Sequence, residues 1–211
     1  MLKDKTAKFI NIDTGFEDAI NTAKKIYLEG KVFVYPTDTI YGLGANPFNE
    51  QAVESVNEIK GREAGKMYIL LVGDIDTLLQ YVEINSEKHL DFLISIWPNP
   101  ISVILNLNSK FRKLLNRNDA AFRIPHHRFC LKLLSELKMP LISTSVNRSN
   151  QSPVTEPGLI RDEFSSEVEA IFYSKKRSFI KASTIITLAD SKPGLIREGK
   201  IKYADLLKKF G

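Results

Sequence analysis

Residues 36–44, with the sequence PTDTIYGLG, form the first segment of the chain whose residue types could do chemistry. They follow a short apolar run that predicts a strand, and they carry hydroxyl groups at Thr37 and Thr39. The glycines of the segment would let the backbone approach a ligand closely. A local turn bonded by Asp38 explains the same residues equally well. On this segment alone, a ligand site and a simple turn both stay open.

A second segment places three cations, Lys60, Arg62 and Lys66, within seven residues between a predicted helix and a predicted strand. Cations at the end of a helix are favoured by its dipole by about 0.3–1 kcal/mol each, so a structural role is one explanation. A clamp for a polyphosphate or a carboxylate is the other. Arginine supplies a planar fork for such groups, and lysine supplies a point charge.

A third segment follows the apolar pair Leu141-Ile142. Its side chains at Ser143, Ser145 and Asn147 would share one face of a strand, which would be wet or would line a ligand. A strand that simply ends in a polar loop is the alternative. In α/β sheets ligands bind beyond the ends of strands. Five polar residues of the chain lie at predicted strand ends: Thr39, Arg123, Ser145, Ser183 and Arg197.

Several common catalytic templates are missing from the sequence, including the phosphate-binding P-loop, the H-E-x-x-H zinc motif and the G-x-S-x-G elbow. His126 and His127 are adjacent, so their side chains would point apart and make a poor metal pair. The single cysteine, Cys130, lies in an apolar helical stretch and is expected to be a core residue rather than a nucleophile.

The composition is that of a globular protein. The 211 residues include 30 basic and 25 acidic side chains, a net charge of +5, and 43% are hydrophobic, which excludes disorder as the main state. No linker is evident, so we expect a single domain over residues 1–211. One cysteine fits a reducing compartment, and neither a signal peptide nor a membrane span is evident, so we expect a cytoplasmic protein with no membrane partner.

The periodicity predicts a mixed α/β fold around a mainly buried sheet. Thr14 and Glu17 suggest a capping box for the first helix, and Gly30 suggests its end. Asn49 suggests the cap of the second helix. Helices are predicted over residues 16–29, 50–60, 74–81, 86–96, 129–137 and 203–210, and strands over 31–35, 67–72, 101–107, 120–124, 141–144, 169–173 and 183–188.

Six motifs occur in order along the chain: PTDTIYGLGANPFN, IKGR, AAFRIP, STSVN, STIITL and LIREG. Together they resemble the YrdC family, the threonylcarbamoyl-adenylate synthases, over about residues 16–199. The resemblance implies the short, single-domain form of a YrdC-like fold. In that fold a twisted, mostly buried sheet is flanked by helices and bears a large, open, positively charged cleft.

The resemblance also implies a nucleotidyltransferase. L-threonine, bicarbonate and ATP with Mg²⁺ give threonylcarbamoyl-AMP and pyrophosphate, and a downstream transferase then modifies the tRNA adenosine beside the anticodon. It assigns no metal ligands to the protein. It implies catalytic roles for Lys60, Arg62, Ser145 and Asn147, ATP binding by Arg62, Lys66, Ser145 and Arg197, and threonine binding by Thr39, Arg123, Ser143 and Ser183.

The chain departs from the family pattern at four places. Met67 replaces a proline, Asn99 and Asn150 replace turn glycines, and residues 150–154 differ from the usual loop. Asparagine tolerates the left-handed backbone better than most residues, so both glycine replacements fit a turn. We expect loop 147–157 to close over ATP. Two other functions stay open: a module that binds double-stranded RNA or tRNA, and a diverged paralogue with another carbamoyl acceptor.

Overall fold

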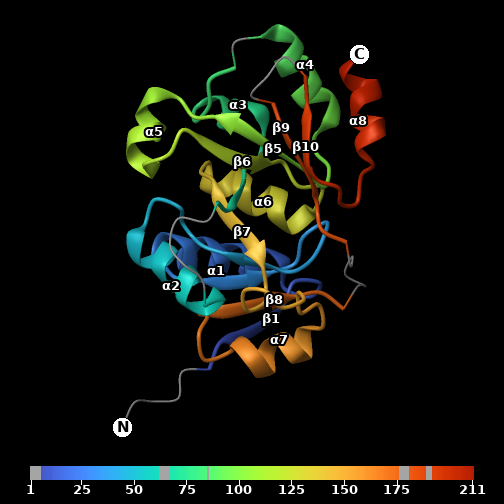
Figure 1. Ribbon diagram of the computed structural model, residues 1–211. Coiled ribbons are helices and arrows are strands. Elements are labelled where there is room, and N and C mark those ends of the chain that lie inside the picture. The colour runs from blue at the N-terminus through green and yellow to red at the C-terminus, as the bar shows by residue number, and fades with distance from the viewer. Residues whose placement is uncertain (1–5, 62–66, 85, 176–180, 189–191) are drawn as a thin grey trace. The chain divides into compact units, whose positions relative to one another are not determined.

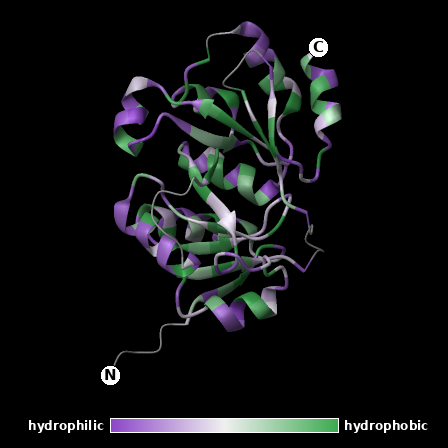
Figure 2. Cartoon of the chain, viewed as in Figure 1, coloured by the Kyte–Doolittle hydropathy of each residue, from purple (hydrophilic) through white to green (hydrophobic). Residues whose placement is uncertain are grey.

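The chain folds into two units, each built from two separate stretches of sequence. A computed structural model describes residues 6–61, 67–84, 86–175, 181–188 and 192–211 (Figure 1). Unit 1 comprises Met1–Lys66 and Leu141–Ile180, and unit 2 comprises Met67–Pro140 and Lys181–Gly211. Strands are mainly hydrophobic in both units, whereas the helices carry hydrophobic and hydrophilic residues, as Figure 2 shows. Each unit is therefore a mixed α/β structure, as the sequence predicts.

Unit 1 contains a run of paired strands in the order β1-β8-β2-β3-β7. The pairs β1–β8 and β8–β2 are parallel, and the pairs β2–β3 and β3–β7 are antiparallel. Strand β3 is short and glycine-rich, and its Gly42 lies directly opposite Ser145 of β7. The strands are β1 (Lys8–Asn11), β2 (Phe33–Tyr35), β3 (Gly42–Gly44), β7 (Leu141–Ser145) and β8 (Ala170–Tyr173).

The helices of unit 1 are α1 (Phe16–Leu28), α2 (Glu50–Lys60) and α7 (Pro157–Phe164). Helix α1 buries Ala19, Ile20 and Ala23 on one face, as its spacing predicts. The predicted capping box is wrong: Gly15 occupies the N-cap position, and no side chain caps the helix. The predicted end is confirmed, because Gly30 has a φ of +68°, a left-handed conformation that favours glycine.

Unit 2 contains a run of paired strands in the order β4-β6-β5-β9-β10. The pairs β4–β6 and β5–β9 are parallel, whereas β6–β5 and β9–β10 are antiparallel. The strands are β4 (Ile69–Leu71), β5 (Ile101–Asn106), β6 (Asp119–Arg123), β9 (Thr184–Thr187) and β10 (Gly194–Arg197). The helices are α3 (Ile75–Leu79), α4 (Glu87–Ile96), α5 (Ser109–Leu115), α6 (Arg128–Leu137) and α8 (Tyr203–Phe210).

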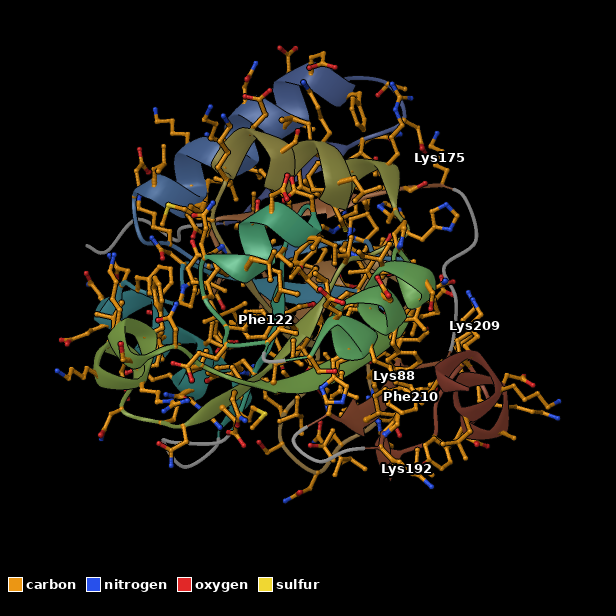
Figure 3. All side chains as sticks on the ribbon, turned by 90° about the horizontal axis from the view of Figure 1, so that it is seen from above. Lys88, Phe122, Lys175, Lys192, Lys209 and Phe210 are labelled. Atoms are coloured by element: carbon orange, nitrogen blue, oxygen red, sulfur yellow. The ribbon has the colours of Figure 1, made fainter. Side chains whose placement is uncertain are left out.

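Helix α8 packs against α4 within unit 2. The Phe210 and Phe92 rings meet edge to face with centroids 5.2 Å apart, a favourable geometry for aromatic pairs. Lys88 lies beside Phe210, as Figure 3 shows. Its Nζ is 4.4 Å from the centroid of the Phe210 ring and donates to the carbonyl oxygen of Gly211 at 3.1 Å. Lys209 Nζ donates to the Ser95 carbonyl oxygen at 3.0 Å. These contacts hold the C-terminal helix on its own unit.

Five elements have no counterpart among the predicted elements: β1, β3, β10, α5 and α7. Helix α3 is also shorter than predicted and ends at Leu79. The two asparagine replacements differ in outcome. Asn150 has a φ of +65° and takes the left-handed conformation, but Asn99 has no positive φ, and its side chain instead donates to the Ile96 carbonyl oxygen at 2.9 Å.

The cap of α2 gives a direct test of this local structure. Asn49 Oδ1 accepts a hydrogen bond from the backbone of Ala52 at 2.9 Å, as the sequence predicts. Asn49→Ala is expected to lower the free energy of unfolding by about 1 kcal/mol, because the first turn loses that acceptor. Urea unfolding measures the change. Ser86→Ala is the matched control, since Ser86 holds the N-cap of α4 without a side-chain cap bond. Equal losses in the two variants would contradict a role for the Asn49 cap.

Within the described residues, none of the helices combines the length and the apolar character that crossing a membrane would need.

Candidate functional site

Three predicted site residues of unit 1 meet in one hydrogen-bonded group, the Lys60 cluster, made of Lys60, Ser145 and Asn147. Lys60 is the last residue of α2, and Gly61 ends the helix in the left-handed conformation with a φ of +56°. Ser145 ends β7, and Asn147 follows it by two residues. A helix end and a strand end therefore bring together residues that lie 85 and 87 positions apart in the sequence.

The ammonium group of Lys60 is buried, with 4% of the residue exposed. Its Nζ donates to the Ser145 carbonyl oxygen at 2.7 Å, to Ser145 Oγ at 3.4 Å and to Asn147 Oδ1. Ser145 Oγ donates to the same Asn147 Oδ1 at 2.6 Å, and Asn147 Nδ2 donates to the Gln151 carbonyl oxygen at 2.5 Å. These three acceptors are neutral oxygen atoms, so they stabilise the buried cation as dipoles.

Thr39 and Ser143, the two predicted threonine-binding residues of unit 1, are both buried, at 3% and 8% exposure. Thr39 lies in a turn in which Thr37 Oγ1 accepts from the Thr39 backbone at 3.0 Å and donates to the Ile40 carbonyl oxygen at 2.7 Å. Thr37 therefore makes turn contacts of the kind that the sequence also suggests for Asp38. A Cβ atom at Gly42 would lie 3.2 Å from Ser143 Oγ, so glycine there leaves room for the serine hydroxyl.

Unit 2 contributes a second group, the Arg123 cluster, made of Arg123, Ser183 and Arg197. Arg123 ends β6 and is 3% exposed, and Ser183 precedes β9 and is 2% exposed. Ser183 Oγ lies 3.0 Å from Ser102 Oγ, and Arg197 Nη2 donates to the Ser183 carbonyl oxygen at 3.0 Å. Partial desolvation and, to a smaller extent, repulsion from Arg123 lower the pKa of Arg197 below its usual value. The positive charges of Arg123 and Arg197 therefore repel each other in this cluster. Such an arrangement favours the binding of an anion over that of a cation.

The backbone of the segment after β10 passes close to the backbone of Ser183. Gly199 N donates to Thr184 Oγ1 at 2.9 Å, and a Cβ atom at position 199 would overlap backbone atoms of Ala182 and Ser183. Thr184 Oγ1 also accepts from Ile201 N at 3.1 Å. A glycine is thus required at 199 for Arg197 to reach the start of β9.

Two residues assigned to the site from the sequence, Arg62 and Lys66, lie outside the residues that the structure describes. Among those it does describe, no group of three or more His, Cys, Asp or Glu could hold a metal ion. Cys130 is fully buried, and its Sγ lies 3.7 Å from His127 Nδ1. Its place in the core is as predicted.

The site residues predicted from the sequence did not include Ser102, Thr184 and Arg148, which contact the candidate residues or their neighbours. Ser102 could have been predicted from the sequence, because it is a polar residue inside the apolar run ISVIL, which forms a buried strand. Arg148 could not have been predicted in this way, since arginine residues are common in polar surface loops.

The two clusters offer different chemistry. The Lys60 cluster presents one buried cation with a hydroxyl and an amide, and the Arg123 cluster presents guanidinium groups beside a serine hydroxyl. Guanidinium groups bind carboxylates and phosphates through two parallel bonds, whereas an ammonium group acts as a point charge. The serine hydroxyl of the Lys60 cluster donates to an amide oxygen and not to a base, so the arrangement suits catalysis by binding and charge stabilisation.

Comparisons with known proteins extend across both units. A threonylcarbamoyl-AMP synthase of Pyrococcus abyssi is 28% identical over 205 residues, which cover 96% of this chain and 60% of that protein. This chain therefore spans about three fifths of the length of that relative. The structure of P. abyssi Sua5 complexed with L-threonine matches with a TM-score of 0.87 at 26% identity, over 97% of this chain and 61% of that one.

A second solved structure has a similar length. E. coli YciO matches with a TM-score of 0.83 at 26% identity, over 98% of this chain and 100% of that one. The Sua5/YciO/YrdC family model, described as telomere recombination, matches residues 25–199 of the 211. The resemblance found in the sequence motifs is thereby confirmed, and the chain belongs to the Sua5/YciO/YrdC family.

Proposed function

We propose that this protein is a threonylcarbamoyl-AMP synthase. The observation that carries the proposal is the likeness to P. abyssi Sua5 complexed with L-threonine, which extends over 97% of this chain. The P. abyssi protein named threonylcarbamoyl-AMP synthase supports the same activity at 28% identity. The proposed substrates are L-threonine, bicarbonate and ATP, and the products are threonylcarbamoyl-AMP, pyrophosphate and water.

The proposed reaction has two steps. The threonine amine attacks the carbon of bicarbonate, and loss of water leaves a carbamate. A carbamate oxygen then attacks the α-phosphorus of ATP, the bond to the β-phosphate oxygen breaks, and pyrophosphate leaves. Carbamate and triphosphate are both anions, so positively charged groups must hold them together and stabilise the charge that develops on the phosphate oxygens.

In this proposal the Lys60 cluster works on the transfer step. The Lys60 ammonium supplies a fixed positive charge, and it holds Ser145 Oγ and Asn147 Oδ1 in place through the bonds described above. Fixed dipoles and charges do not have to reorganise when the transition state forms, which is the main advantage of such a site. Arg62 is proposed as the fourth catalytic group, and ATP binding is assigned to Arg62, Lys66, Ser145 and Arg197.

Threonine recognition is proposed for Thr39, Ser143, Arg123 and Ser183. The buried hydroxyl groups of these residues would bond the amine and hydroxyl of threonine, and Arg123 would form a fork on its carboxylate. A site built to hydrogen-bond a substrate hydroxyl rejects an analogue that lacks it, because its own buried polar groups are left unpaired. We therefore expect L-valine to be a far poorer substrate than L-threonine.

The divalent cation is proposed to arrive with ATP. Mg²⁺ is commonly bound through substrate phosphates with only one or two carboxylates, so the lack of a three-residue cluster among the described residues is compatible with it. When bound, the ion would neutralise part of the phosphate charge. The product would pass to a transferase that modifies tRNA.

The test is pyrophosphate release from ATP, Mg²⁺ and bicarbonate, measured with and without L-threonine. Release is expected to need L-threonine and to fall by about 10²-fold or more with L-valine. L-serine, which keeps the hydroxyl, is the matched comparison. Release that is independent of the amino acid, or no release although ATP binds, would contradict the proposal and favour a diverged member of the family or an RNA-binding protein.

A further inference from the structure

Arg148 directly follows Asn147 of the Lys60 cluster, and its guanidinium group bonds residues from other segments of unit 1. Its Nη1 donates to the Ile59 carbonyl oxygen at 2.6 Å and to Glu167 Oε2 at 2.9 Å. Its Nη2 donates to Glu167 Oε1 at 2.5 Å, so the guanidinium and the carboxylate form a two-bonded fork. Glu163 Oε1 lies 3.7 Å from Nε, and the Phe164 ring lies under the guanidinium carbon at 4.6 Å.

These contacts tie three parts of unit 1 to one side chain. Ile59 belongs to the last turn of α2, Glu163 and Phe164 end α7, and Glu167 lies between α7 and β8. The fork with Glu167 raises the pKa of Arg148, and desolvation opposes that rise. Both side chains of the pair are about one third exposed, at 33% and 34%. Solvent screens the attraction between their charges, so the main effect of the fork is to fix the position of the Arg148 side chain.

The residue after Arg148 makes a second contact with the same helix end. Ser149 N donates to the Lys60 carbonyl oxygen at 2.7 Å. The last four carbonyl groups of a helix have no partner within the helix, and here two neighbouring ones are bonded by two neighbouring residues of the loop. The side chain of Lys60 makes a further bond to the same loop, because its Nζ donates to Asn147 Oδ1. The loop after β7 is thus fastened to the end of α2 at three consecutive positions, 147–149.

We propose that Arg148 is a positioning residue that fixes Asn147 against Lys60 by holding the loop after β7 on the end of α2. The catalytic part of this inference rests on the proposed function, because it assumes that the Lys60 cluster serves the transfer step. The structural part does not. Removing the guanidinium frees the Ile59 carbonyl oxygen and Glu167. Of the bonds to the end of α2 described above, the loop then keeps those of the Ser149 backbone and the Asn147 side chain.

The test uses Arg148→Leu and Arg148→Lys in the full chain. Arg148→Leu is expected to lower kcat for pyrophosphate release about 10- to 100-fold, since small misplacements of catalytic groups have effects of that size. The KM for L-threonine should stay within about twofold. Arg148→Lys can keep one bond, to Ile59 or to Glu167, and should recover part of kcat. Arg161→Leu is the matched control, because Arg161 lies on α7 with its side chain 52% exposed and paired to Asp162.

Amide hydrogen exchange separates the two parts of the inference. In Arg148→Leu the Ser149 amide should exchange faster than in the wild type, while the Ile142 amide, bonded to the Ala45 carbonyl oxygen at 3.0 Å, should stay protected. A protected Ser149 amide with unchanged kcat would overturn the proposal. Faster exchange with unchanged kcat would overturn the catalytic part. If the wild type released no pyrophosphate, the proposed function would fail, and the exchange result alone would decide the structural part. If Arg148→Leu did not fold, Arg148→Lys would decide both parts by the same measurements.

Discussion

Replacing Lys60 by methionine is expected to reduce kcat for threonine-dependent pyrophosphate release by about 10²- to 10³-fold. Methionine fills a similar volume but removes the buried cation, which is the charge proposed to stabilise the α-phosphate during transfer of the adenylyl group. It also leaves the Ser145 carbonyl oxygen and Asn147 Oδ1 without their lysine donor. Steady-state kinetics on folded protein, with the folded fraction checked by thermal unfolding, measures the effect.

The control for this variant is Lys25→Met. Lys25 lies in the last turn of α1, also in unit 1, but its side chain is 77% exposed and pairs with Glu29 at 3.9 Å. We expect its kcat to equal that of the wild type. If Lys60→Met folded and kept more than about a third of the wild-type kcat, the assignment of Lys60 to the transfer step would be wrong.

Replacing Gly199 by alanine is expected to lower the free energy of unfolding by about 3 kcal/mol or more. The new Cβ atom would overlap the Ser183 carbonyl carbon and the carbonyl oxygens of Ala182 and Ser183. These are backbone atoms at the start of β9, so no side chain can rotate away to relieve the overlap. The midpoint of urea unfolding measures the loss.

Gly158→Ala is the matched substitution for comparison. Gly158 lies in the first turn of α7, and a Cβ atom there would meet no atom within 4 Å. Because alanine is favoured over glycine in a helix by up to about 1 kcal/mol, this variant should be as stable as the wild type or slightly more stable. Similar unfolding midpoints for the two variants would show that β9 can move away from residue 199, contrary to our expectation.

Local sequence signals predicted the elements that local contacts define. Helix α2 is the clearest case, because Asn49 caps its start and a left-handed Gly61 ends it. Strand β3 is the opposite case. Its residues, GLG, have little intrinsic preference for a strand, and it forms between β2 and β7. The predicted capping box of α1 was wrong because the sequence pattern is not decisive. A Thr-x-x-Glu pattern is compatible with a capping box, but it is equally compatible with a helix that begins after Gly15.

For the candidate site, the residues were easier to predict than their grouping. The alternation of Ser143, Ser145 and Asn147 indicated a polar face. Nothing in the spacing showed that Lys60 would bond Ser145 and Asn147, which lie 85 and 87 residues away. The resemblance to a family supplied the grouping instead. Neither the spacing nor the resemblance indicated Arg148. Its partners lie in α2, in α7 and between α7 and β8, and the α2 partner, Ile59, is 89 residues away.

Arg197 carries its positive charge in a partly desolvated position that is also under the influence of a second cation, Arg123. Two guanidinium groups repel each other there, and the lowered pKa of Arg197 reflects desolvation first and this repulsion second. An anion that binds between such charges gains its own contacts and also relieves the repulsion. An anion bound at this point would therefore also stabilise the folded state of unit 2. We therefore expect a small anion such as phosphate, bound beside this pair, to raise the free energy of unfolding of unit 2.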